Sequence, residues 1–84
     1  ILGVMTMEPF IINYGKRSDI TYTVDAMAAL EKARRFAMAD GMSAEEANDP
    51  DLVFVEPCDH LTARDRGLVW IDEGGRWEQA EPRA

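Results

Sequence analysis

The sequence predicts a single small α+β domain, in which one main amphipathic helix covers one face of an antiparallel sheet of four to five strands. Three observations lead to this prediction. Two runs of alternating apolar and polar residues lie close together near the beginning of the chain. A long stretch of strong helix formers follows, and short apolar runs bounded by Pro, Gly and Asp come after it. A helix packed on a sheet is the simplest way for this β-β-α-β-β order to bury its apolar surfaces.

The two alternating runs span residues 10–14 and 20–24, and the polar residues 15–19 separate them. Alternation with a period of two is typical of a strand with one buried face, and the short separation favours an antiparallel hairpin. Residues 1–8 show no clear pattern, so we expect them to form a loose leader.

The main helix is predicted over residues 26–40, with Asp25 as its N-cap and Gly41 ending it through a positive φ. Its apolar residues recur at three- and four-residue spacing and form one stripe, made of Ala26, Ala29, Leu30, Ala33, Phe36 and Ala37. Because this stripe is mainly alanine, the helix backbone can approach the sheet closely. We expect the helix to bury Leu30, Ala33 and Phe36 against a sheet that includes Phe10, Ile12, Tyr22, Val53 or Phe54, and Val69 or Trp70.

A short helix and a third strand are predicted next. Ser43 and Glu46 match a capping box and predict one or two helical turns, which residues 48–50 would stop. The apolar residues 52–56, ended by a proline, predict a strand. Residues 58–66 are polar and lack periodicity, so we expect them to be irregular.

The C-terminal part is predicted to form a second hairpin. Residues 67–72 are mainly apolar and predict a fourth strand, and a tight turn at 73–75 leads into a short return strand at 76–78. Residues 79–84 are expected to form a loose tail. All 84 residues, 1–84, are expected to form one domain.

The charge of the chain is concentrated in one segment. Sixteen Asp and Glu residues against nine Lys and Arg residues give a formal net charge of −7. Between Arg35 and Arg64 the chain has seven acidic residues and no Lys or Arg. A chain of this charge is poorly suited to bind a nucleic-acid backbone directly. The segment is either a solvated surface that favours solubility or a negative patch for a basic partner.

The second interpretation gives a set of partner-binding residues. Because complementary charge steers association, we expect acidic side chains of this segment to make the contact. Aromatic residues are frequent binding hot spots, so Trp77 is a candidate anchor, whereas Trp70 is expected in the core. The predicted partner-binding residues are Glu45, Glu46, Asp49, Asp51, Glu56, Asp59 and Trp77.

Motifs for catalysis or metal binding are weak. Cys58 and His60 form the one pair with a reactive appearance, but one Cys and one His cannot fill a four-ligand zinc site within one chain. A nucleophilic Cys58 activated by His60 would need both side chains to face one cavity. Adjacent acidic pairs such as Asp72 and Glu73 are typical of solvated turns. We therefore predict no catalytic residue, no metal site and no cofactor.

Several stretches of the chain resemble small phage-borne proteins. These are residues 10–14, residues 21–26 leading into the alanine-rich helix, residues 67–70 and residues 74–77. In their β-β-α-β-β order and closing hairpin they resemble some type I anti-CRISPR proteins, over roughly residues 9–78. The resemblance implies a non-enzymatic inhibitor that binds a bacterial surveillance complex and blocks its access to DNA. It assigns no functional residue in this sequence.

We therefore expect a non-enzymatic acidic interaction protein that binds a partner with a basic nucleic-acid-binding surface. On this hypothesis it is a phage or mobile-element inhibitor of a bacterial defence complex that acts by nucleic-acid mimicry. The alternatives are a phage or bacterial accessory or adaptor module, and a small enzyme that uses Cys58 and His60. A single cysteine and short apolar runs favour the cytoplasm of the bacterial host, with no membrane contact and no direct nucleic-acid contact. A monomer and a homodimer are both compatible with the sequence.

Overall fold

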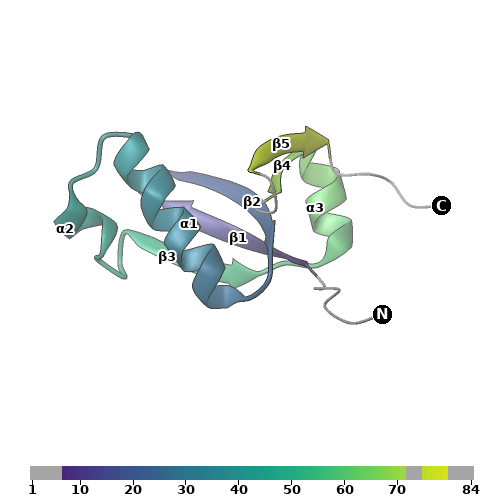
Figure 1. Cartoon of the computed structure of the whole chain (residues 1–84), viewed down its shortest axis with the longest axis horizontal. Coiled ribbons are helices and arrows are strands. Elements are labelled where there is room, and N and C mark those ends of the chain that lie inside the picture. The colour runs from purple at the N-terminus through teal and green to yellow at the C-terminus, as the bar shows by residue number, and fades with distance from the viewer. Residues whose placement is uncertain (1–6, 72–74, 80–84) are drawn as a thin grey trace.

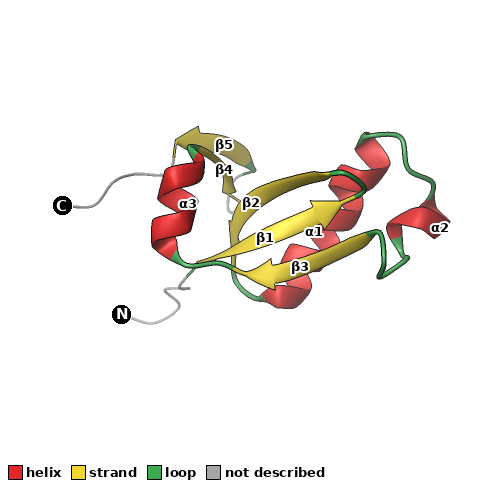
Figure 2. Ribbon diagram, turned by 180° about the vertical axis from the view of Figure 1, so that it is seen from behind, coloured by secondary structure: helices red, strands yellow, loops and turns green. Residues whose placement is uncertain are grey.

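Five strands form one mixed sheet, and the main helix α1 lies across one face of it (Figures 1 and 2). The computed structural model describes residues 7–71 and 75–79. The strand order is β3-β1-β2-β4-β5. The α+β fold with one main helix is the fold that the sequence predicts. Along the chain the elements are β1 (Glu8–Tyr14), β2 (Arg17–Thr23), α1 (Ala26–Ala39), α2 (Ala44–Ala47), β3 (Val53–Pro57), α3 (His60–Arg66), β4 (Leu68–Ile71) and β5 (Arg76–Gln79).

The sheet is mixed because β2 pairs with β4 in parallel, while the other three pairs are antiparallel. The expectation of an antiparallel sheet is wrong at this one pair. Residues 58–66, expected to be irregular, contain the helix α3, which carries the chain back over the sheet. The strand β4 therefore enters in the same direction as β3. At this parallel pair the Thr21 hydroxyl donates a hydrogen bond to the Trp70 carbonyl at 3.0 Å.

Two crossover connections determine where the helices lie. Helix α1 lies in the connection from β2 to β3, two parallel strands on either side of β1. Helix α3 lies in the connection from β3 to β4, which are also parallel. The first connection moves toward the β3 edge of the sheet, and the second moves back toward the β5 edge. Crossovers between parallel strands are right-handed in nearly all proteins. Two crossovers that run in opposite senses therefore place their helices on opposite faces, and α1 and α3 pack against different sets of sheet residues.

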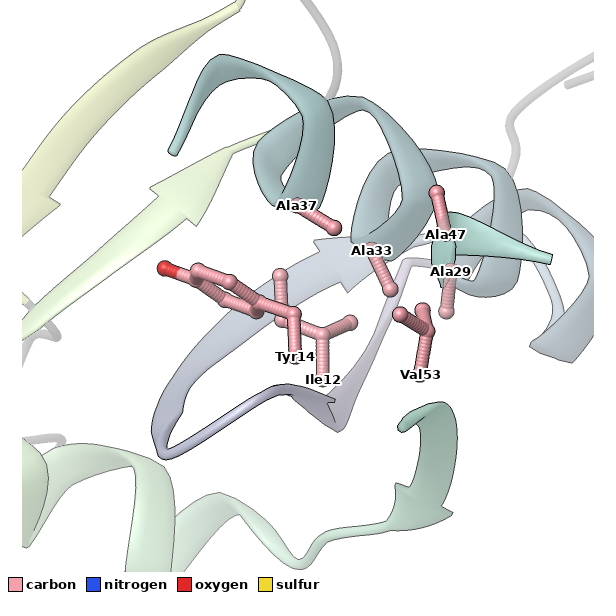
Figure 3. Packing of buried hydrophobic residues seen from close by; sticks show 7 residues of the cluster. All are labelled: Ile12, Tyr14, Ala29, Ala33, Ala37, Ala47 and Val53. Carbon is pink, nitrogen blue, oxygen red and sulfur yellow. The ribbon is translucent and has the colours of Figure 1, made fainter. Parts of the chain in front are cut away.

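The larger core lies between α1 and the strands β1 and β3 (Figure 3). The three buried alanines of α1 are 0% exposed, which confirms the close approach that the alanine stripe predicts. Leu30 and Phe36, which the helix was expected to bury against the sheet, pack against this core and are partly buried. The buried members are Ile12, Tyr14, Ala29, Ala33, Ala37, Ala47 and Val53.

A second, smaller core lies on the other face of the sheet. Ala63 of α3 is buried there against Ile20 and Val69, and Tyr22 and Cys58 pack around them. The expectation that Tyr22 faces α1 is wrong, because side chains alternate along β2 and the neighbouring Thr21 and Thr23 occupy the α1 side.

Several element boundaries differ from those expected. The first hairpin turns within Gly15 and Lys16, and a φ of 67° at Gly15 provides the left-handed conformation that such a tight turn requires. The strand β2 therefore begins at Arg17. Glu8, placed in the expected leader, begins β1, and Gln79, placed in the expected tail, ends β5. The other residues expected in the leader and tail are Met7, which precedes β1, and residues 1–6 and 80–84, which lie outside the described residues. The same is true of residues 72–74, the end of the expected fourth strand and most of the following turn.

Candidate functional site

The structure brings four of the predicted partner-binding acids together near α2. Glu45 and Glu46 are exposed on this helix, and Asp49 and Asp51 follow in the turn that leads to β3. Helix α2 lies at one extremity of the molecule, beyond the C-terminal end of α1 (Figure 1). We call this surface, made of Glu45, Glu46, Asp49 and Asp51, the acidic end.

Two acids of the acidic end have local structural roles. Glu46 completes a capping box with Ser43, in which its carboxylate accepts from the Ser43 backbone N–H at 2.9 Å. The Asp49 carboxylate accepts from the backbone N–H of Asp51, also at 2.9 Å. The carboxylates of Glu45 and Asp51 make no hydrogen bond or ion pair with any residue in 7–71 or 75–79. Their charge is therefore available to a partner.

The other three predicted partner-binding residues lie elsewhere. Glu56 is on β3, pairs with Ile11 and accepts a hydrogen bond from Asn13 at 3.0 Å. Asp59 is the N-cap of α3 and accepts from the Thr62 backbone N–H at 2.6 Å. Along β3, Glu56 lies three residues, or about 10 Å at about 3.3 Å per residue, beyond Val53, where the strand begins after the acidic end. Asp59 follows the other end of the strand. Trp77 is on β5, at the far edge of the sheet, so the seven residues do not form one surface.

Trp77 belongs to an aromatic cluster on the α1 side of the sheet. Its ring centroid lies 5.8 Å from that of Phe36 and 5.4 Å from that of Trp70, its direct cross-strand partner. Phe36 also meets the Tyr14 ring edge to face at 6.0 Å. Trp77 nevertheless remains 45% exposed. These contacts hold the Trp77 ring in place while leaving nearly half of the residue open to solvent.

An open cleft of about 250 Å³ lies beside Trp77. It is built where the C-terminal end of α1 meets the β1–β2 hairpin and β5, three elements far apart in the sequence. We call it the aromatic cleft, and its lining residues are Tyr14, Arg17, Asp19, Phe36, Ala39, Asp40 and Trp77.

Polar side chains of the aromatic cleft are held by specific pairs. The buried Tyr14 donates its hydroxyl hydrogen to the Asp19 carboxylate. Burial, followed by this hydrogen bond and the charge of Asp19, raises the pKa of Tyr14 well above its ordinary value, so the hydroxyl stays a donor at neutral pH. Arg17 pairs with Asp40 at 2.9 Å, and its guanidinium carbon lies 6.0 Å from the centre of the Tyr14 ring.

Sequence reasoning found only Trp77 among the residues that line the aromatic cleft. The missing signal was the register of the first hairpin. Tyr14 pairs with Arg17 and Ile12 pairs with Asp19, so Asp19 is a diagonal neighbour of Tyr14 on the same face. A loop of five residues, as expected from the sequence, hides this relation.

The pair of Cys58 and His60 lacks the arrangement of an activated nucleophile. Burial, and then the charge of Asp59, raises the pKa of the Cys58 thiol, which opposes formation of the reactive thiolate. The thiol donates to the carbonyl of Asp59 at 3.3 Å, and the His60 ring shares a hydrogen bond with the Tyr22 hydroxyl at 3.2 Å. Within residues 7–71 and 75–79, no group of three or more His, Cys, Asp or Glu side chains is placed to hold a metal ion.

Two further findings concern the helices and the comparison with known proteins. None of the helices in the described part of the chain has both the length and the apolar character needed to span a bilayer. Comparison of the chain with protein-family models, with curated proteins and with solved structures gives no match in any of the three.

Proposed function

We propose that this chain is a non-enzymatic interaction protein whose acidic end binds a basic, nucleic-acid-binding surface of another protein and blocks that surface. One observation carries the proposal. The acidic end displays four acidic residues in a segment that contains no Lys or Arg from residue 36 to residue 63. Glu45 and Asp51, both exposed, form no side-chain hydrogen bond or ion pair within the described residues.

The physical basis is electrostatic complementarity. Like charges on one surface repel each other, and a basic surface placed against them removes the repulsion. Exposed charges also steer diffusional encounter, and salt screens this effect beyond about 10 Å at 0.1 M ionic strength. Binding through the acidic end should therefore be fast at low salt and should weaken as salt rises.

The charge of the chain indicates the class of partner. A chain with a net charge of −7 repels a phosphate backbone, but it is suited to a groove that normally holds nucleic acid. In its predicted β-β-α-β-β order and closing hairpin, the sequence resembles some type I anti-CRISPR proteins. This resemblance supports a bacterial defence complex as the partner. The protein would then act in the cytoplasm of the bacterial host.

The enzyme alternative has less support. A catalytic thiol needs a lowered pKa and an adjacent base. The pKa of Cys58 is raised instead, and the His60 ring is engaged with Tyr22.

A competition assay tests the proposal. A purified type I surveillance complex loaded with its guide RNA is titrated with a fluorescent target duplex, with and without this protein, at about 0.05 and 0.3 M salt. The protein should weaken DNA binding by about tenfold or more at the lower salt and by less at the higher salt. Unchanged DNA binding at every concentration of the protein would contradict an inhibitor of this complex.

Charge-reversal variants locate the contact. Glu45→Lys combined with Asp51→Lys should abolish most of the competition, because it reverses two of the four charges of the acidic end. The fold should be retained, because these two carboxylates have no hydrogen bond to lose within the described structure. Asp65→Lys, an exposed change on α3, is the control and should compete like the unmodified protein. Full competition by the double variant would place the contact outside the acidic end.

A further inference from the structure

We propose that the aromatic cleft binds an arginine side chain of the partner protein, with the guanidinium between the Trp77 ring and the Asp19 carboxylate. This inference rests on the proposed function, because it supplies a specific contact for the basic surface that the acidic end attracts. The cleft and the acidic end are also close along the chain, since Asp40 lines the cleft and Glu45 begins the acidic end.

The size of the aromatic cleft suits one side chain. Its volume of about 250 Å³ lies below the range of about 300–1,000 Å³ that is typical of drug-sized ligand sites. Its walls come from helix α1 and three strands, β1, β2 and β5, so their backbones are held by the fold. A side chain projecting from a partner surface can enter such an open cleft without a lid.

The aromatic wall offers a stacking surface for a planar cation. Trp77 is 45% exposed, yet ring contacts with Phe36 and Trp70 fix its orientation. A guanidinium group stacks on aromatic faces and is more weakly hydrated than an ammonium group, so it loses less on leaving water. Among charged side chains, arginine therefore fits this wall best.

The polar wall carries one uncompensated negative charge. The charge of Asp40 is balanced by Arg17 at 2.9 Å. Asp19 accepts from the Tyr14 hydroxyl, which is a neutral donor, and it forms no ion pair with any residue in 7–71 or 75–79. Asp19, Asp40 and Arg17 together leave a net charge of −1 in the cleft. A carboxylate is the natural partner of a guanidinium, which donates two parallel hydrogen bonds to it.

The same features disfavour other ligands. An anion would face the net negative charge of the cleft and of the whole chain. A neutral apolar group would leave the Asp19 carboxylate without a cation and with less water around it, which has a cost. A lysine ammonium group would balance the charge of Asp19, but it is not planar and would not stack on the Trp77 ring as a guanidinium does.

A peptide titration followed by two-dimensional NMR tests the proposal without the partner. The probes are the blocked tripeptide Gly-Arg-Gly, the same peptide with citrulline, and the same peptide with lysine. Citrulline keeps the shape of arginine and removes its charge. The arginine peptide should shift the Trp77 indole N–H and bind at least about fivefold more tightly than the citrulline peptide, because the cation adds a charge-assisted bond and a ring contact. The lysine peptide should bind with intermediate affinity.

Two variants and a matched control complete the experiment. Asp19→Asn and Trp77→Leu should each weaken binding of the arginine peptide by about fivefold or more. Asp65→Asn, the same change on α3, should leave it within about twofold, and the NMR spectra report whether each variant is folded. Equal binding of the arginine and citrulline peptides, or no shift of the Trp77 signal, would overturn the proposal. Since the acidic end is intact throughout, such a failure would leave the competition assay with Glu45 and Asp51 as a separate test of the proposed function.

Discussion

Tyr14 links the core to the charged surface through a single side chain. Its ring is buried beside Ile12 in the larger core, and its hydroxyl reaches the Asp19 carboxylate on the neighbouring strand. The two residues are diagonal cross-strand neighbours on one face, which places them within reach of each other. Because the Tyr14 ring is held in the core, its hydrogen bond fixes the position of the Asp19 carboxylate. Both residues line the aromatic cleft, so the geometry of the cleft depends on the packing of the core.

Removing the Tyr14 hydroxyl should destabilise the fold. Tyr14→Phe keeps the ring but deprives the half-buried Asp19 of its donor, and a hydrogen bond to a charged group contributes about 1.5–3 kcal/mol. Urea denaturation should show a loss of this size in the free energy of unfolding. Tyr22→Phe is the control, since the Tyr22 hydroxyl meets the exposed His60, and it should change stability by no more than about 0.5 kcal/mol. Equal losses in both variants would show that the bond to Asp19 contributes little.

Tyr14 should also make the protein sensitive to alkaline pH. Its pKa is raised above the ordinary value of 10.0 in the folded state, so the folded state retains a proton that the unfolded state releases. This contribution to stability is fully present below pH 10 and is lost as pH rises through the folded-state pKa. Unfolding measured at pH 9 and at about pH 11 should show a smaller alkaline loss for Tyr14→Phe than for the unmodified protein. Identical losses would mean that Tyr14 does not carry the effect.

At the scale of elements, the sequence predicted the features that depend on neighbouring residues, namely the helix caps and the buried face of α1. Asp25 caps α1 by accepting from the Ala28 backbone N–H at 2.8 Å, and Ser43 and Glu46 form their capping box. Three alanines of the stripe, Ala29, Ala33 and Ala37, are buried, whereas Ala26 is exposed. Helix α3 escaped detection because its seven residues bury little besides Ala63. Its signal was the N-cap Asp59 three residues before Thr62. Without α3, nothing in the sequence indicates that β4 runs parallel to β2.

The three buried alanines of α1, Ala29, Ala33 and Ala37, should tolerate no larger side chain. Ala33 is 0% exposed at the centre of the contact between α1 and the sheet, so a leucine there must push the helix away (Figure 3). Overpacking of this kind costs about 1–3 kcal/mol. Thermal or urea unfolding of Ala33→Leu should show that loss, while Ala26→Leu, exposed at the first residue of α1, should be near neutral. A stable Ala33→Leu would mean that α1 does not approach the sheet this closely.

The Asp59 cap of α3 should make the stability of the protein depend on pH in the acid range. Hydrogen bonds from Thr62 lower the pKa of Asp59, so the carboxylate contributes stability that is present above its unfolded-state pKa of about 3.9 and is lost as pH falls through the folded-state value. Asp59→Asn keeps a capping acceptor without that titration. Its unfolding free energy should fall less than that of the unmodified protein between pH 7 and pH 3. Asp59→Ala, which removes the cap altogether, should be the less stable variant already at pH 7. The same acid slope in the unmodified protein and in Asp59→Asn would rule out this carboxylate.

At the scale of the whole molecule, charge can be read from the sequence, whereas the shape of a site cannot. The acidic end lies within one short segment, so counting acidic residues predicts it and the fold only gathers its members. The aromatic cleft combines residues from β1, β2, α1 and β5, and it exists only through the register of two hairpins. Trp77 was identified because aromatic residues are frequent binding hot spots and it follows the expected turn at residues 73–75. Asp19 gave no signal of its own, and Asp40 counted only as one of the seven acidic residues between Arg35 and Arg64.

The acidic end should contribute to binding and not to folding. Glu45 and Asp51 have no hydrogen-bond partner for their carboxylates in the described structure, and they lie among like charges, so neutralising them should relieve repulsion. The double variant Glu45→Gln with Asp51→Asn should be as stable as the unmodified protein or more stable by up to about 0.5 kcal/mol in about 10 mM salt. The difference should vanish in about 0.5 M salt, where surface charges are screened. Glu46→Ala is the contrasting variant: it breaks the capping box and should lower stability at both salt concentrations. A loss of stability in the double variant would show that these two acids serve the fold, and would remove the reason for assigning them to a partner.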